Sequence, residues 1–334
     1  MKLIWKLIII FIVTGLILST IGLVAGASRT LYWDKTGVTI SSGEISHITS
    51  WDIEPIESIY IDAGFSDVEF VISNVFAIEL YSENAQWEWK TGDVLEITQK
   101  RNTVTQILSF DSTPAQRSYV KVILPENAEL GVVDVKTNSG NINLGGFKAD
   151  TVNIKSSFGD VDLNGITSSH LNADLNSGRL SVVFIDTGTF VYSNSYGDAI
   201  FKSVNADTFR ANSNSGNTRF IDCTFGDTGI TSRFGDITGN EFISSKTNIS
   251  SNSGSVDLNG TLSGETVIHT GFGNTTLTTS LEKELYSYDI SVRFGNITFD
   301  DVLRGDQSSL ISGSTMENHL KLSSSSGDIN VNFK

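Results

Sequence analysis

The sequence predicts an all-β protein. We expect a single-stranded parallel β-helix (β-solenoid) of about ten 19-residue coils with an irregular N-terminal β cap, preceded by one transmembrane helix. Three observations predict it: a glycine that recurs every 19 residues, apolar residues that alternate with polar ones after each glycine, and one long uncharged segment near the N-terminus. A fixed period near 20 residues is typical of repeat architectures, in which each unit buries its apolar face only by stacking on its neighbours.

Residues 7–27 form an uncharged apolar segment that follows Lys2 and Lys6. About 20 apolar residues span a bilayer as a helix, and lysines before the span keep that end in the cytoplasm. The sequence therefore predicts a cytoplasmic tail at 1–6, a transmembrane anchor, and an extracellular remainder. The alternative is a signal peptide, because an Ala-Gly-Ala pattern permits cleavage before Ser28, although the apolar run exceeds the usual 7–15 or so residues.

The segment that follows divides into a stalk and a cap. Residues 28–50 are predicted to form a polar stalk between membrane and domain. Residues 51–131 contain alternating runs without the 19-residue period, such as those at 58–72 and 119–125, which predict irregular strands. We expect them to cap the solenoid at 132–334, because a bare solenoid end exposes unpaired strand edges.

The repeat is clearest in a column of eight glycines that are 19 residues apart. These are Gly140, Gly159, Gly178, Gly197, Gly216, Gly235, Gly254 and Gly273. Glycine suits a corner that needs positive φ or a close backbone approach. Gly295 and Gly327 follow at wider spacing, so the register of the last coils stays open. Residues 300–324 are predicted to be an irregular last coil or insertion before a closing strand at 329–333.

Apolar residues follow each glycine at fixed positions. After Gly140, Ile142 and Leu144 alternate with polar residues, as in a strand with one buried face. Positions 12 and 14 after the glycine predict a second strand, as at Phe190 and Tyr192. Each coil is therefore expected to hold two short strands and two turns and to rise about 4.8 Å, which makes a rod of roughly 50 Å.

The residue before each glycine alternates between serine and an aromatic residue, so the full sequence unit is 38 residues. The aromatic members are Phe158, Tyr196, Phe234 and Phe272. One interpretation is steric, because alternating large and small residues interdigitate. The other is an exposed row, spaced by about 10 Å, that stacks on sugar rings. Whether the row points inward or outward stays open.

Acidic and amide residues follow the glycines. The acidic ones are Asp160, Asp198, Asp236 and Asp328. Asp and Asn favour turns, so we interpret this column as turn chemistry, with a weak cation site or catalytic carboxylates as alternatives. Arg179 is an isolated basic neighbour, and the four histidines share no metal-ligand spacing. The sequence therefore predicts no catalytic, cofactor-binding or metal site and no cofactor.

Composition narrows the possible partners. The chain has 23 basic and 38 acidic residues, a net charge of −15, and no basic cluster. This excludes nucleic acid as a partner, because phosphate binding needs clustered Lys and Arg. Its one cysteine, Cys223, permits no intrachain disulfide and is expected to be a small buried residue rather than a reactive thiol. An exported chain without disulfides favours a Gram-positive exterior.

The repeated units resemble a known family. The motifs NSGNINL (138–144) and SFGDVDL (157–163), preceded by VKVILP (120–125) and an N-terminal apolar segment, resemble the DUF4097 family, also called "putative adhesin". The resemblance covers roughly 55–334. It implies an extracytoplasmic β-solenoid of Gram-positive bacteria, in some cases associated with envelope stress, and it offers no catalytic residues.

We therefore expect a non-enzymatic cell-envelope protein, bound to the membrane through residues 7–27, whose extracellular solenoid binds an unidentified protein or glycan of the envelope or cell surface. One alternative is a carbohydrate-active enzyme. The other is a structural spacer that assembles through its terminal edge strand. Active sites usually break a repeat with long loops, and the breaks here lie near 278–294 and 300–324.

Overall fold

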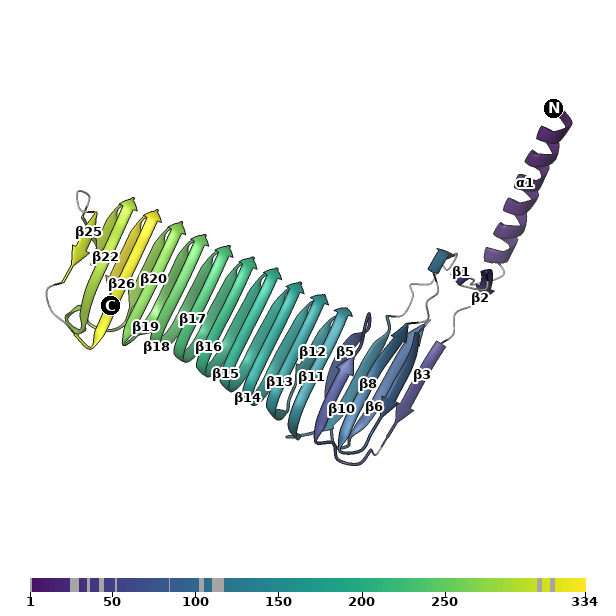
Figure 1. Ribbon diagram of the computed structural model, residues 1–334, viewed down its shortest axis with the longest axis horizontal. Coiled ribbons are helices and arrows are strands. Elements are labelled where there is room, and N and C mark those ends of the chain that lie inside the picture. Colours follow the sequence, from purple (N-terminus) through teal and green to yellow (C-terminus); the bar gives the residue numbers. More distant parts are fainter. Residues whose placement is uncertain are drawn as a thin grey trace.

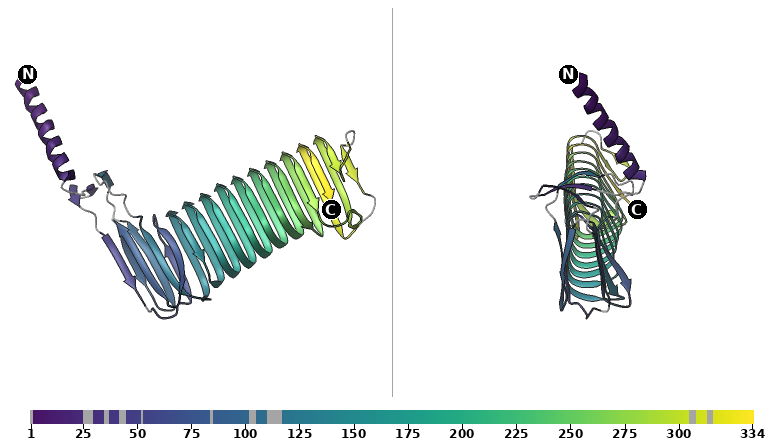
Figure 2. Two further views of the ribbon diagram at one scale, coloured as in Figure 1. Left: turned by 180° about the vertical axis from the view of Figure 1, so that it is seen from behind. Right: turned by 90° about the vertical axis from the view of Figure 1, so that its right-hand side faces the viewer.

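The computed structural model describes residues 2–24, 30–34, 37–41, 45–51, 53–83, 85–101, 105–109, 117–304, 308–312 and 316–334. Most strands belong to one continuous sheet that winds into a parallel solenoid, with the coils stacked along the long axis (Figure 1). Seen from the end in Figure 2, the coils superpose into a narrow, flattened section. The predicted β-solenoid is confirmed.

The chain begins with α1 (Lys2–Val24). Over the part of the chain that the structure describes, no helix has the length and apolar character to cross a membrane. Anchoring through residues 7–27 and cleavage before Ser28 stay predictions. A small antiparallel sheet follows, made of β1 (Thr30–Asp34), β2 (Gly37–Ser41) and β9 (Thr105–Ser109).

The N-terminal region closes one end of the solenoid. Its strands are β3 (Ile45–Ser50), β4 (Ser58–Asp62), β5 (Asp67–Ser73), β6 (Ala77–Glu83), β7 (Ala85–Lys90), β8 (Val94–Arg101) and β10 (Tyr119–Pro125). Strands β4 and β5 pair in parallel with solenoid strands on one side and with β8 and β10 on the other. Strands β3, β6 and β7 add antiparallel pairs beyond these. The expectation of a stalk through 28–50 is wrong for β3, which pairs with β6 in the main sheet.

The regular coils comprise β11 (Glu129–Ser139), β12 (Ile142–Gly145), β13 (Lys148–Phe158), β14 (Val161–Ser177), β15 (Leu180–Tyr196), β16 (Ala199–Ser215), β17 (Thr218–Phe234), β18 (Ile237–Ser253), β19 (Val256–Leu262), β20 (Glu265–Phe272) and β21 (Thr275–Thr279). Strands β14 to β18 each run for 17 residues around nearly the whole coil. From β14 to β18, each paired residue lies 19 positions before its partner in the next strand, whereas the pairing of β18 with β19 shifts register between Asn240 and Phe242. The prediction of two separate strands is therefore wrong for these coils.

The second corner bends the chain without interrupting this pairing because one residue per coil adopts a left-handed conformation. It lies six positions after the corner glycine. It is Phe184, Ser203, Asp222 or Glu241 in the central coils, with φ between 52° and 55°, and Gly146 or Gly165 in the first ones. Non-glycine residues seldom adopt this conformation. Asp222 and Ser203 are residues that turns favour, whereas Phe184 and Glu241 give no turn signal.

The predicted apolar columns face inward and form one continuous core. Its centre is aromatic. Phe201 and Phe220, which pair in adjacent coils, stack with ring centroids 5.1 Å apart. Cys223 is fully buried beside them, and burial raises the pKa of its thiol to about 11. The expectation of a buried cysteine is confirmed.

The C-terminal coils are out of chain order. They comprise the 3₁₀ turn η1 (Lys283–Leu285), β22 (Tyr286–Phe294), β23 (Ile297–Phe299), β24 (Val302–Leu303), β25 (Ser309–Ile311), β26 (Asn318–Ser326) and β27 (Ile329–Phe333). Strand β26 pairs with β20 on one side and β22 on the other, so the last coil is inserted before the preceding one (Figure 1). Strands β24 and β25 pair antiparallel with the outer coil. The segment 300–324, which was expected to be irregular, therefore includes β24 and β25, which cover the edge of the outer coil, and most of β26.

The corner glycines stack directly on one another. A Cβ at Gly178 would lie 2.0 Å from the carbonyl oxygen of Gly159, and one at Gly216 would lie 2.1 Å from that of Gly197. Both residues have φ of 128°. Any larger residue would therefore push adjacent coils apart at this corner.

We expect Gly216→Ala to lower the free energy of unfolding by about 3–5 kcal/mol, because it combines backbone overlap with an unfavourable φ. The measurement is denaturant unfolding followed by circular dichroism. Gly92→Ala is the control, because a Cβ there meets nothing within 4 Å. Equal stability of the two variants would contradict the close approach at the corner.

We expect Gly165→Ala to cost about 1 kcal/mol, because only its φ of 65° is unfavourable for alanine. A Cβ there comes no closer than 3.8 Å to the nearest atom, the nitrogen of Gly146. Gly165→Asn should cost less, since asparagine tolerates this conformation, and Gly165→Val should cost more. The same unfolding measurement checks the order, and a loss as large as that of Gly216→Ala would show that space also limits the second corner.

Candidate functional site

A line of aromatic side chains projects from the glycine corner into solvent. We call it the aromatic row, and its members are Phe65, Phe158, Tyr196, Phe234, Phe272 and Phe294. Between 42% and 65% of each residue is exposed. The direction that the sequence left open is therefore outward. The two end members do not follow from the 19-residue spacing, because Phe65 lies in an irregular coil and Phe294 lies beyond the regular spacing.

Serines separate the aromatic residues in space. Ser177 pairs with Phe158 and with Tyr196, and Ser253 pairs with Phe234 and with Phe272. At the C-terminal end, the chain order would bring two aromatic residues into neighbouring coils. The inserted coil places Ser326 between Phe272 and Phe294. The alternation therefore holds along the edge of the molecule even where it fails along the chain.

Coil stacking does not explain this alternation. Phe201 and Phe220 occupy the same position in adjacent coils and stack with an interplanar angle of 16°. Aromatic rings on neighbouring strands are favourable pairs in general. The steric interpretation, in which adjacent rings would crowd each other, is therefore not required by this fold.

A shallow polar groove of about 440 Å³ borders the middle of the row. Its side chains come from consecutive coils, just before the corner. Those that are not buried are Asp174, Ser193, Ser195, Asn212, Asn214, Thr231, Arg233, Ser250 and Asn252. Ser195 and Arg233 directly precede Tyr196 and Phe234 in the chain, so the groove lies one residue before the row at these two coils. Most of its groups are uncharged hydroxyls and amides.

The column after the glycine is a hydrogen-bond ladder. One carboxylate oxygen of Asp160 accepts the backbone N–H of Arg179 in the next coil at 2.8 Å, and its other oxygen lies 3.7 Å from the Arg179 guanidinium. Asp198 and Asp236 accept backbone N–H groups of the next coils at 2.7 and 2.8 Å. Asn141, Asn217 and Asn274 accept in the same way. These side chains therefore join successive coils at the corner.

The other chemical groups are separated. Within the described residues, no group of three or more His, Cys, Asp or Glu side chains is placed to hold a metal ion. His47 lies beside Glu79, with 3.2 Å between ring nitrogen and carboxylate, while His269 contacts Ser323. Among the described residues, the histidines thus do not belong to a set of side chains that could bind a metal ion.

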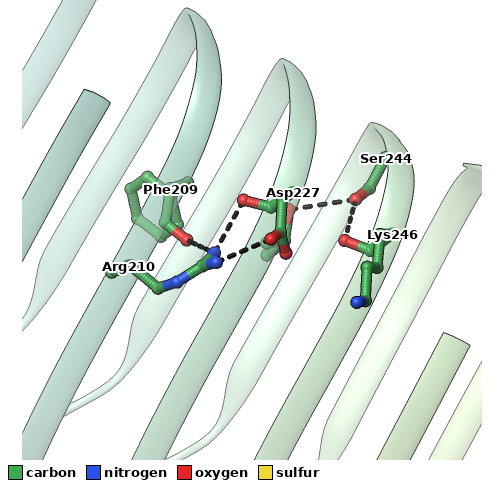
Figure 3. A network of polar contacts seen from close by, with 6 residues as sticks. Phe209, Arg210, Asp227, Ser244 and Lys246 are labelled. Atoms are coloured by element: carbon green, nitrogen blue, oxygen red, sulfur yellow. Dashed lines mark hydrogen bonds and ion pairs between the residues drawn. The ribbon is translucent and has the colours of Figure 1, made fainter. Parts of the chain in front are cut away.

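One ion pair lies on the outer face at a distance from the corner. Arg210 donates to the backbone oxygens of Phe209 and Asp227 and to the Asp227 carboxylate, at 2.7 to 3.0 Å (Figure 3). In the next coil the Ser244 hydroxyl donates to the backbone oxygen of Lys246 at 2.9 Å. Gly229 leaves space for the arginine stem, since a Cβ there would meet it at 2.9 Å. The network joins adjacent coils and is structural.

These features define a class: a parallel β-solenoid that presents a periodic aromatic edge. The chain belongs to the DUF4097 family, because the family model described as Toastrack DUF4097 matches residues 56–183 and 167–332. The search of curated proteins finds no match.

Two solved structures are similar to the chain. One is called a "putative adhesin" from Bacteroides fragilis and is 13% identical, with a TM-score of 0.35, covering 87% of this chain and 97% of that one. The other is called a "putative cell adhesion protein" from Clostridium sporogenes and is 9% identical, with a TM-score of 0.22, covering 87% of this chain and 100% of that one.

We expect Asp236→Asn to leave stability nearly unchanged, because an amide oxygen accepts the same N–H, as Asn217 does. Asp236→Ala should lower the free energy of unfolding by about 1 kcal/mol, because it removes the acceptor. Denaturant unfolding with and without Ca²⁺ is the measurement. Calcium stabilisation of the native chain that Asp236→Asn abolishes would instead identify a cation site.

Proposed function

We propose that this chain is a non-enzymatic surface protein that holds an elongated partner along the edge formed by the aromatic row. The observation that supports it is the row itself, six half-exposed rings at regular intervals along one edge. Large exposed apolar groups that are rimmed by polar residues mark interaction sites. An edge of this kind suits a long partner better than a small molecule, which would need a concave pocket.

The ladder supports this proposal over an enzyme. The carboxylates that a hydrolase would need as acid and base are engaged at the corner by backbone N–H groups, as at Asp198 and Asp236. The repeat breaks near 278–294, where the chain forms η1 and the strand β22 of the outer coil. These segments close the solenoid.

The ends of the solenoid support the proposal over a self-assembling spacer. At the C-terminal end the short strands β24 and β25 pair antiparallel with the outer coil. At the other end the pairing changes from parallel to antiparallel at β6 and β7. Short strands that cover an edge oppose edge-to-edge pairing between molecules.

We place the solenoid on the outside of the cell envelope, held by residues 7–27. The apolar, uncharged character of this segment after two lysines supports the placement. The acidic composition favours partners without strong negative charge.

The test mixes the full-length chain in detergent with bacterial envelope fragments and measures both co-sedimentation and release of soluble product. We expect retention without product. The double variant Tyr196→Ser/Phe234→Ser should lose retention, because it removes two rings from the row. The variant should still fold, because serine occupies this corner position in alternate coils.

Phe184→Ser is the matched control. Phe184 is 61% exposed but lies at the second corner, where the equivalent residue of the next coil is Ser203. Release of new reducing ends would show that the chain cleaves a polysaccharide, and it would contradict the proposal of a non-enzymatic protein. Absence of retention in the unmodified chain would favour a spacer.

A further inference from the structure

We infer that the aromatic row and its groove bind a neutral β-1,4-linked polysaccharide that lies along the solenoid axis, with one ring for each disaccharide. The inference rests on the proposed function and names the class of partner. It is supported by the spacing of the rings, by the uncharged groups beside them, and by the backbone N–H groups at this corner that already bond from coil to coil.

The spacing of the rings matches this polymer. Rings occur in every second coil, and the coils are one strand spacing apart, so neighbouring rings lie about 10 Å apart. In an extended β-1,4-linked chain each pyranose is turned over relative to the one before it. Equivalent faces therefore recur every second sugar, over a comparable length. Ring faces stack on the apolar C–H face of such sugars, which suits the amphipathic character of exposed Phe and Tyr.

The gaps between rings suit the alternate sugars. Ser177, Ser215 and Ser253 leave space and offer hydroxyls between successive rings. Asn214 and Asn252, which precede two of these serines, line the groove and offer amides at the same intervals. Hydroxyls and amides both donate and accept hydrogen bonds, as sugar hydroxyls require.

Charge selects a neutral polymer. The full chain carries a net charge of −15, which repels a polyanion. Within the groove, Asp174 and Arg233 bring one charge of each sign among uncharged neighbours.

A peptide strand fits this edge less well. Extended peptides bind by adding main-chain hydrogen bonds to a free strand edge. At the glycine corner these groups already bond from coil to coil, as the N–H of Gly178 does to the oxygen of Tyr196 at 3.1 Å and that of Gly197 to Ser215 at 3.0 Å. Side-chain stacking is therefore the mode of recognition that this edge offers.

The experiment measures binding of the full-length chain in detergent to soluble chito-oligosaccharides and cello-oligosaccharides of two to eight sugars by calorimetry. These two arms distinguish N-acetylated from plain glucose units. We expect affinity to rise in steps of two sugars as each further ring is engaged. Maltooligosaccharides, whose α-1,4 linkage lacks the extended two-sugar repeat, are the ligand control and should bind weakly.

Variants test the row and its period. Tyr196→Ser/Phe234→Ser should weaken binding of the octamer by about 100-fold, since each anchoring ring contributes about tenfold. Ser215→Phe adds a ring but closes a gap, and it should also weaken binding. Phe184→Ser should bind like the unmodified chain. Thermal unfolding checks that each variant is folded.

Two outcomes would overturn the inference. One is oligosaccharide binding that the loss of both rings leaves unchanged. The other is that the chain binds neither β-1,4-linked series, although it still co-sediments with envelope fragments and the double variant does not. The second result would leave the proposed function intact and redirect the search to a protein partner, which protease treatment of the fragments would reveal.

Discussion

The stacking of one corner glycine on the next is the contact on which the whole solenoid depends. The carbonyl oxygen of each glycine lies only 2.0 to 2.4 Å from the point where a Cβ on the next glycine of the main column would be. Because only a residue without Cβ permits this approach, each coil that stacks on another here carries glycine at the corner, beginning with Gly140 on Ser66. The recurrence of glycine along the repeat follows from this requirement. Once the corner is set, equivalent apolar residues of successive coils superpose, and the core forms as continuous inward columns.

The same contact gives its two neighbours different roles. The residue after the glycine has a backbone N–H that the side chain at the same position of the preceding coil accepts. Each such residue therefore carries an acceptor for the next coil, as Asn217 does for Asp236 and Asp236 for Ser255. The residue before the glycine points outward at a convex corner, as Tyr196 and Phe234 do. It contributes little to the core and is free to contact a partner. The residue that joins the coils and the residue that is exposed to solvent thus lie two positions apart in the chain.

Sequence periodicity predicted the features that repeat and missed those that depend on pairing. The buried columns and the glycine corner followed from spacing alone, and the burial of Cys223 followed from its residue type. A second turn in each coil was predicted, but its position could not be, because Phe184 and Glu241 give no turn signal although both adopt a left-handed conformation. The direction of the aromatic row was also open, since the rule of alternating faces applies within a strand and does not extend through a corner.

The inserted last coil shows why the row is a property of the assembled edge. Along the chain, Phe272 is followed by Phe294, and Ser326 comes last. Pairing of β26 between β20 and β22 reorders them, so that one serine separates the two rings. Stacked rings are compatible with this fold, as Phe201 and Phe220 demonstrate in the core. The insertion therefore keeps one ring in every second coil up to the end of the solenoid, although stacking of the coils alone does not require this spacing. A ligand that contacts every second coil would explain the alternation both in the regular coils and at the inserted coil.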